Sequence, residues 1–311
     1  MVACVLRLLR RELVNGVVTM SQVFATLSNQ IEVQPLSGSL GAEVLGVDLA
    51  QLDDGAFDAI YSAFVQHQVV VFRDQDLTPE QYLAFAHRWG GIHPHPFMKH
   101  LEEYPGILEI IKTETDTKAF GNGWHSDQMF VDKPSKCTML YAKEVPATGG
   151  DTLFANLHDA YDALSDGMKT LVGGLKGWNT GDRQKLRARA SQDDREALTL
   201  AQMEEKAPPS GVQTESVHPL VRTHADSGRK ALYLGGHTMR IDGMSDEESA
   251  PLLNYLKQHA VRPEFTCRVG WEVGSLTIWD NRCVQHYALN DYQGQRRRMH
   301  RITIEGQEVP Y

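Results

Sequence analysis

The chain has 311 residues, of which 41% are hydrophobic and 23% are charged, and its formal net charge is −9. These proportions are those of an ordinary globular protein, and they exclude disordered, collagen-like and coiled-coil classes. Nucleic acids and anionic membranes require a positive field that an acidic chain lacks. We therefore expect neither as a partner and predict a small-molecule ligand.

The cysteines and the apolar runs bear on the cellular compartment. Four cysteines, at positions 4, 137, 267 and 283, are scattered without a CxxC spacing. This pattern suits a reducing compartment, so we predict a cytoplasmic protein. No run of about 18 apolar residues occurs, which predicts that no helix spans a membrane.

The first twenty residues differ in character from the rest. They mix apolar residues with Arg7, Arg10 and Arg11. The arginines interrupt the continuous apolar core that a signal peptide needs. We interpret residues 1–20 as an amphipathic tail or a mis-assigned start upstream of Met20.

Residues 30–90 predict a mixture of strands and helices. Their apolar patterns predict strands over residues 30–36, 42–49 and 69–72, and a helical period predicts an amphipathic helix over residues 55–66. Thr78, Pro79 and Gln81 form a capping signature that predicts the start of a second helix.

Beyond Gly106, short strand-like segments dominate. Runs of β-branched and aromatic residues between turn residues predict eight strands, over residues 107–112, 136–143, 151–155, 217–223, 231–234, 264–269, 275–279 and 299–304. One further helix is expected after Ser245, which forms a capping box with Glu248. The predicted fold class is mainly β with flanking helices (α+β), a two-sheet roll or barrel rather than a doubly wound parallel sheet.

A charged segment, residues 182–206, lies between strand-like segments. We interpret it as a solvated helical insertion, because charge runs usually form exposed surfaces. A lid over a site is the alternative. The predicted organisation is one domain over residues 21–311 that carries this segment.

Local motifs narrow the chemistry. The sequence contains no GxGxxG, GxxxxGK[ST], GxSxG or HExxH motif, so dinucleotide binding, P-loop phosphoryl transfer and hydrolase chemistry lack support. His125 and Asp127 stand two residues apart, and on an extended strand they would share a face and reach one metal ion. Completed by a distant histidine, they would form the triad typical of non-haem Fe(II) oxygenases, with positions open for substrate and O₂. Alone the pattern is weak, because thirteen histidines make such pairs common by chance.

Residues 279–304 supply the missing partners. His286 precedes Arg297 by eleven residues, so a hairpin between two strands would bring both beside the metal. The arginine fork suits a carboxylate, which it binds through two parallel hydrogen bonds. A solvated basic patch is the alternative for the run Arg296, Arg297 and Arg298. In a strand, at most alternate members of that run can face the same way.

The motifs WHSD, GGDT, VHPLVRTH, WDNR, QHYA and RRRMHR, in this order, resemble the taurine dioxygenase (TauD/TfdA) family of Fe(II)/2-oxoglutarate-dependent dioxygenases. The resemblance extends from about Ile31 to about Gly306. It implies a double-stranded β-helix, which is a jelly roll of cupin type. It also implies an oxidoreductase that hydroxylates its substrate with O₂ while 2-oxoglutarate is decarboxylated to succinate and CO₂. Relatives of this family commonly form dimers or tetramers, so a homo-oligomer is expected.

The resemblance assigns roles to individual residues. It implies that His125, Asp127 and His286 are the catalytic iron ligands. Thr152 and Arg297 are then expected to hold the cosubstrate 2-oxoglutarate. Trp279 is expected to lie close to the iron without binding it.

Two further matches concern the substrate. His95 and Arg301 match family positions that bind the sulfonate of taurine, which implies a sulfonate, sulfate or carboxylate headgroup. A turn role for His95 and a surface ion pair for Arg301 are the alternatives. Met98, Phe120 and Gly121 replace the polar residues that would support an ammonium group. We therefore predict a small organic anion with an apolar or aromatic tail. Taurine itself, or a non-catalytic metal- and anion-binding relative, are the alternatives.

Overall fold

The structure is a computed structural model that describes residues 31–93, 95, 98, 100–182 and 213–311. Its strands are β1 (Glu32–Pro35), β2 (Ala42–Leu45), β3 (Val69–Phe72), β4 (Leu108–Lys112), β5 (Cys137–Glu144), β6 (Thr152–Asn156), β7 (Lys176–Thr180), β8 (Glu215–Pro219), β9 (Val221–Thr223), β10 (Lys230–Leu232), β11 (Thr238–Ile241), β12 (Thr266–Val269), β13 (Leu276–Asp280), β14 (Val284–Ala288) and β15 (Arg297–Thr303). The α-helices are α3 (Asp54–His67), α4 (Pro79–His87), α5 (Leu157–Asp162), α6 (Asp166–Val172) and α9 (Asp246–Ala260). Two short 3₁₀ helices lie at Leu49–Gln51 and Pro263–Phe265.

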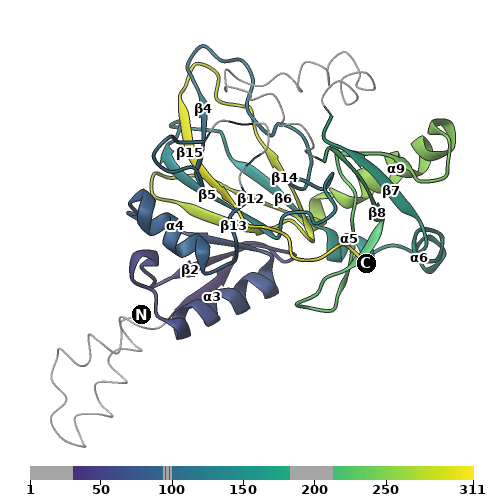
Figure 1. Cartoon of the computed structure of the whole chain (residues 1–311), viewed down its shortest axis with the longest axis horizontal. Helices are drawn as coiled ribbons and strands as arrows, with labels where there is room; N and C mark the ends of the chain where they lie inside the picture. Colours follow the sequence, from purple (N-terminus) through teal and green to yellow (C-terminus); the bar gives the residue numbers. More distant parts are fainter. Residues whose placement is uncertain (1–30, 94, 96–97, 99, 183–212) are drawn as a thin grey trace, which may run out of the picture.

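Two sheets form the walls of a roll. The larger sheet has the strand order β1-β2-β3-β13-β5-β15-β4, and a three-stranded sheet has the order β12-β6-β14. Apolar side chains from both sheets share one core, in which the ring of Phe154 on β6 lies 5.6 Å from that of Trp279 on β13. Two small sheets, β11-β7-β8 and β9-β10, lie beside the roll together with α6 and α9 (Figure 1). The jelly-roll fold expected from the sequence is confirmed.

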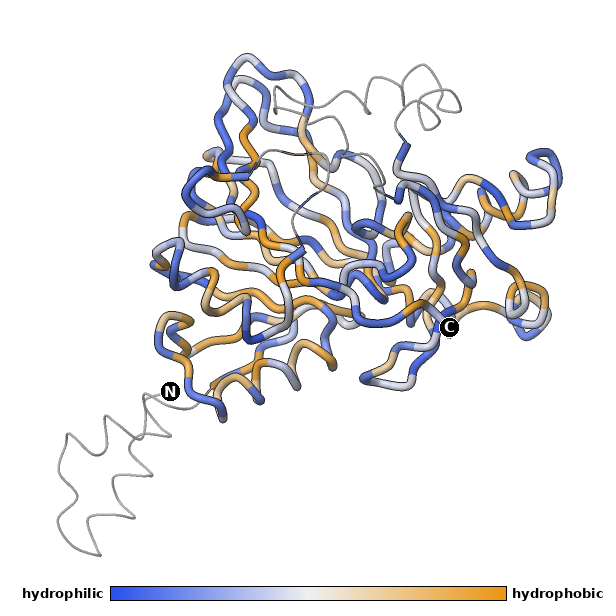
Figure 2. Tube along the Cα trace, viewed as in Figure 1, coloured by the Kyte–Doolittle hydropathy of each residue, from blue (hydrophilic) through white to orange (hydrophobic). Residues whose placement is uncertain are grey.

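Helices α3 and α4 cover the outer face of the larger sheet (Figure 1). Phe64 on α3 and Phe85 on α4 pack against residues of β3, β5, β13 and β15 in a second core. The capping box predicted at Thr78 is present at the start of α4, and the one at Ser245 starts α9. Apolar segments run along the strands inside the molecule, and hydrophilic ones mark the connecting loops (Figure 2).

Side-chain alternation in β5 and β15 brings polar groups to the inside of the roll. In β5, Met139 packs under the helices, whereas Leu140 belongs to the core between the sheets. In β15, Ile302 faces the helices and Met299 faces the inner core. Because alternate residues share a face, Thr138 on β5 and Arg301 on β15 point into the roll.

Several predicted boundaries are wrong. Residues 217–223 are two strands, because the chain leaves β8 at Pro219 and enters β9 in a different sheet. Residues 42–49 stop being extended at Leu45, and residues 263–265 form a 3₁₀ turn before β12. Strands β7 and β11 and helices α5 and α6 were not among the predicted elements, whereas β14 is the strand expected at His286.

The predicted hairpin between His286 and Arg297 is also wrong. His286 lies on β14, in the three-stranded sheet, and Arg297 begins β15, in the seven-stranded sheet. The chain crosses from one wall of the roll to the other, so the two residues meet across the interior.

Except for Asp182, the charged segment 182–206 lies outside the described residues, as does the tail 1–20. Among the described helices, none combines the length and apolar character that crossing a membrane requires.

Candidate active site

Three side chains from two distant parts of the chain converge inside the roll. His125 and Asp127 lie in the segment before β5, and His286 lies in the middle of β14. Oδ1 of Asp127 lies 3.7 Å from Nε2 of His125 and 3.8 Å from Nε2 of His286. One ligand atom from each residue falls within 4.8 Å of the other two. Two imidazoles and one carboxylate at such distances can share one metal ion.

Backbone pairing holds His125 beside His286. The N–H of His286 donates to the carbonyl of His125 over 2.8 Å, and the N–H of His125 donates back over 3.1 Å. Asp127 already lies in a turn, in which Gln128 has a left-handed φ of 53°. His125 and Asp127 therefore do not share one extended strand, the arrangement considered for their spacing, because the chain turns after the bridge to β14. Nδ1 of His125 lies 2.7 Å from the carbonyl of Gly123, which leaves Nε2 as the metal-facing nitrogen.

The site favours the protonation states that a metal ion needs. Burial lowers the pKa of His286 well below its ordinary value of 6.5, and the nearby His125 lowers it further. Burial raises the pKa of Asp127, but the guanidinium of Arg301 and the two imidazoles lower it by more, so it lies well below its usual range. A neutral imidazole and a charged carboxylate are the ligand forms that bind Fe(II) without first losing protons. Two imidazoles and one carboxylate therefore fit Fe(II), the ion that the resemblance of the sequence to the dioxygenase family implies.

A second group lines the same cavity. Nε1 of Trp271 donates to Oγ1 of Thr152 over 3.1 Å, and the guanidinium of Arg297 lies 5.5 Å from the centre of the indole ring of Trp271. Arg297 is 6% exposed, and its Nε and Nη2 atoms have no hydrogen-bond partner among the described residues. Burial lowers the pKa of this guanidinium. Two unused, parallel donors on a buried cation fit a carboxylate ligand.

The three consecutive arginines separate as strand geometry requires. Nε of Arg296 lies 3.0 Å and Nε of Arg298 lies 2.9 Å from the carboxylate of Glu144, and their side chains are 40% and 34% exposed. Arg297 between them points into the roll. The basic-patch interpretation therefore holds for the outer two residues only.

Of the two predicted substrate residues, Arg301 lines the cavity, and His95 lies near a lining residue. Arg301 is buried, and its Nη2 lies 2.8 Å from Oδ2 of Asp127, so a surface ion pair is wrong for this residue. Its Nε has no hydrogen-bond partner among the described residues. The ring of His95 lies 6.5 Å from that of Phe120, which lines the cavity with His125 and Arg301.

Phe120 and Met98, which stand where polar residues would support an ammonium group, lie in different places. Phe120 lines the cavity together with Ile110 and Leu140. Met98 is 1% exposed and belongs to the inner core. β4 and β5 therefore contribute apolar lining residues that the sequence motifs did not indicate.

Sequence reasoning missed the residues behind the carboxylate. Oγ1 of Thr138 donates to Oδ2 of Asp127 over 2.7 Å, and Nδ2 of Asn281 donates to Oγ1 of Thr138 over 2.9 Å. Asn281 belongs to the WDNR motif, which was a signal that some role existed there. Thr138 belongs to no motif, and only the pairing of β5 with β13 and β15 places it beside the metal site.

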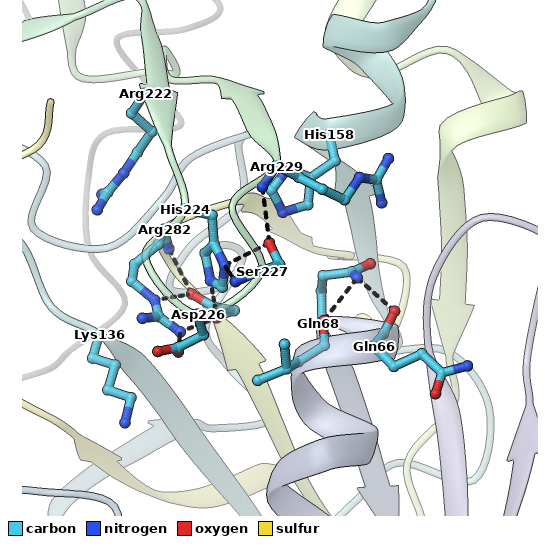
Figure 3. A network of polar contacts seen from close by, with 12 residues as sticks. Gln66, Gln68, Lys136, His158, Arg222, His224, Asp226, Ser227, Arg229 and Arg282 are labelled. Carbon is cyan, nitrogen blue, oxygen red and sulfur yellow. Dashed lines mark hydrogen bonds and ion pairs between the residues drawn. The ribbon is translucent and has the colours of Figure 1, made fainter.

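A second buried cluster also brings possible metal ligands together. Ligand atoms of His224, Asp280 and Cys283 lie within 4.8 Å of one another. However, Arg282 donates to both carboxylate oxygens of Asp280, from Nε over 2.8 Å and from Nη2 over 2.7 Å. Figure 3 shows Arg282 beside His224 and Asp226. Nη2 of Arg282 also donates to the carboxylate of Asp226 over 2.7 Å. A cation would have to displace this guanidinium, so the cluster is a structural ion-pair network.

Comparisons with known proteins agree with this geometry. A family model described as "Taurine catabolism dioxygenase TauD, TfdA family" matches residues 32–303. An alkylsulfatase from Acinetobacter baylyi is 33% identical over 282 residues, which cover 90% of this chain and 86% of that protein. An alpha-ketoglutarate-dependent sulfate ester dioxygenase from Pseudomonas putida is 36% identical over 285 residues, which cover 90% of this chain and 91% of that protein. The crystal structure of a taurine dioxygenase from Burkholderia xenovorans matches with a TM-score of 0.74 and 33% identity, covering 90% of this chain and 92% of that one. The chain therefore belongs to the TauD/TfdA family and is a dioxygenase that uses Fe(II), 2-oxoglutarate and O₂.

Proposed function

We propose that the protein hydroxylates a small organic anion with an apolar tail, and that sulfate esters of apolar alcohols are its preferred class. The observation that carries this proposal is the cavity that the metal cluster shares with two buried arginines and an apolar wall. Its lining includes His125, His286, Arg297, Arg301 and Phe120. A mostly apolar pocket with a few convergent cations suits a ligand with one anionic end.

In this proposal, His125, Asp127 and His286 hold Fe(II). The bound iron supplies O₂ activation, driven by the oxidative decarboxylation of 2-oxoglutarate. Arg297 holds the distal carboxylate of 2-oxoglutarate through its two free donors, and Thr152 contributes a hydroxyl that Trp271 orients. The buried walls exclude water from the reacting atoms.

Arg301 and His95 are proposed to bind the anionic headgroup. The guanidinium of Arg301 uses Nη2 for Asp127, and its Nε is a buried donor that an anion would satisfy. Phe120, Ile110 and Leu140 would contact the apolar tail. The relatives named as an alkylsulfatase and as a sulfate ester dioxygenase support sulfate over the other anions. Among the described residues that line the cavity, none carries a carboxylate that could pair with an ammonium group.

Substrate preference tests this proposal. Hydroxylation of the carbon next to the ester oxygen would make a product that collapses to an aldehyde and sulfate. We expect hexyl sulfate to be turned over with a kcat/KM roughly tenfold above that of ethyl sulfate, because burying about two of its extra methylenes contributes about 1.6 kcal/mol. Succinate, aldehyde and sulfate are measured with Fe(II), 2-oxoglutarate and O₂ present. Hexyl sulfonate, phenoxyacetate and taurine are tested as substrates in the same assay. Turnover of taurine above that of hexyl sulfate would overturn the proposal.

Truncation of Arg297 tests the cosubstrate site. Arg297→Ala removes the buried partner of the carboxylate, so 2-oxoglutarate binding should weaken by about 2–5 kcal/mol. Anaerobic titration of the Fe(II) protein with 2-oxoglutarate, followed by the visible charge-transfer band, measures this effect. Arg298→Ala removes a half-exposed arginine paired with Glu144 and should leave the affinity unchanged. Equal affinities for the two variants would exclude the assignment of Arg297.

Three coarser assignments complete the proposal. We place the protein in the cytoplasm, which agrees with the buried, unpaired thiols of Cys137, Cys267 and Cys283. One domain over residues 21–311 and a homo-oligomer of two or four copies remain predictions. Size-exclusion chromatography with light scattering measures the number of copies.

A further inference from the structure

The two oxygens of the Asp127 carboxylate have different surroundings. Oδ1 faces the Nε2 atoms of His125 and His286, at 3.7 and 3.8 Å. Oδ2 accepts a hydrogen bond from Oγ1 of Thr138 over 2.7 Å and lies 2.8 Å from Nη2 of Arg301. The donors of Oδ2 come from β5 and β15, which are neighbouring strands of the larger sheet. One oxygen is therefore directed to the metal position and the other is held from behind.

Thr138 is itself part of a chain of hydrogen bonds whose direction can be assigned. Nε1 of Trp279, which can only donate, donates to Oδ1 of Asn281 over 3.0 Å. The amide nitrogen of Asn281 must then face the other way, where it donates to Oγ1 of Thr138 over 2.9 Å and to Oγ of Ser135 over 3.1 Å. Because Thr138 accepts from Asn281, its single hydroxyl proton is available for Asp127.

The whole chain is shielded from water. Thr138 and Asn281 have no exposed surface, Ser135 is 1% exposed, Trp279 is 2% exposed and Asp127 is 4% exposed. Hydrogen bonds in such surroundings are not exchanged for bonds to solvent, and a lost one leaves a buried group unsatisfied. Four buried side chains, those of Thr138, Asn281, Ser135 and Trp279, thus form the network behind Oδ2 of Asp127.

We propose that Thr138 and Asn281 are positioning residues that make Asp127 a one-oxygen ligand of Fe(II). A carboxylate that turned to bind through both oxygens would occupy a further coordination position, which the reaction needs for 2-oxoglutarate or O₂. The hydrogen bonds to Oδ2 oppose that rotation, and the chain from Trp279 keeps Thr138 oriented. This inference rests on the proposed role of Asp127 as an iron ligand.

The test substitutes the hydroxyl without changing the shape of the side chain. In Thr138→Val the donor to Oδ2 is lost, so Fe(II) affinity, measured anaerobically against a competing chelator, should fall about 10–100-fold. The Co(II)-loaded variant should also show a changed ligand-field spectrum, because its carboxylate is free to rotate. Thr138→Ser keeps the donor and should restore both readouts. Asn281→Asp cannot donate to Thr138 and should resemble Thr138→Val.

A matched control lies on the adjacent strand. Thr277 on β13 is also fully buried, and its hydroxyl has no hydrogen-bond partner among the described residues. Thr277→Val should leave metal affinity and the Co(II) spectrum as in the unsubstituted protein. Unchanged affinity and spectrum in a folded Thr138→Val variant would overturn the inference alone. Failure of the unsubstituted protein to bind Fe(II) or Co(II) would instead overturn the proposed iron site.

Discussion

Replacing Asp127 with alanine is expected to abolish iron-dependent turnover. The change removes the only charged side chain among the three converging ligands, and it leaves the guanidinium of Arg301 without the carboxylate that it now faces at 2.8 Å. Two neutral imidazoles beside an unpaired cation attract Fe(II) poorly. We expect Fe(II) affinity to fall by more than about 100-fold. Loss of a residue that only hydrogen-bonds to a metal ligand lowers metal affinity by about 10–100-fold, and loss of the ligand itself should cost more.

Anaerobic titration with Fe(II) and 2-oxoglutarate, followed by exposure to O₂, measures the effect of this change. The charge-transfer band should not form in Asp127→Ala, and no succinate should be released. Asp242→Ala is the matched control, since it removes an exposed carboxylate of the same type and should behave as the unsubstituted protein. Circular dichroism checks that each variant is folded. A normal band in folded Asp127→Ala would exclude this residue as an iron ligand.

Replacing Arg282 with alanine is expected to cost about 3–5 kcal/mol of unfolding free energy. Its side chain is 7% exposed and donates to the carboxylates of Asp280 and Asp226. Burial raises the pKa of Asp280, but Arg282 lowers it by more, so this 1% exposed carboxylate stays charged in the native state. Without the guanidinium of Arg282, no cation among the described residues would pair with this buried carboxylate except His224, although the backbone N–H of residue 282 would still donate to it. Breaking a buried pair from one side has this cost.

Urea unfolding measures the loss, and a second arginine near the same network provides the comparison. Arg229 pairs with Asp159 and Asp162, but its side chain is 41% exposed, so Arg229→Ala should cost no more than about 1 kcal/mol. Arg282→Lys keeps the charge but not the fork, and an intermediate loss is expected. If Arg282→Ala were as stable as Arg229→Ala, the network would not hold β13 to the loop after β9.

Local patterns predicted the parts of the fold that depend on neighbouring residues. The capping boxes at Thr78 and Ser245 appear where they were expected, and β3 has the predicted ends. These features involve groups within a few residues of one another, so the sequence contains all their partners. Predictions failed where the chain changes sheets, as at Pro219, because nothing local distinguishes a long strand from two short ones that turn.

The candidate site, like the fold, was predicted from the sequence only in part. His125, Asp127 and His286 could be named from motif order and ligand chemistry, and the fold brings them together. The route by which they meet was mistaken, because His286 and Arg297 lie on opposite walls of the roll and not on one hairpin. Thr138 could not have been found, since a threonine on a buried strand has no local feature that marks it.

By itself, the sequence identified candidate side chains for holding Fe(II) and a carboxylate, because the identity of a donor atom is a property of the residue. It also determined that successive arginines of the run at residues 296–298 must differ, since successive side chains in a strand face opposite ways. Only the tertiary structure decided that Arg301 and Thr138 meet the same oxygen of Asp127. Those contacts depend on the register between β5 and β15, which long-range strand pairing sets and no local segment specifies.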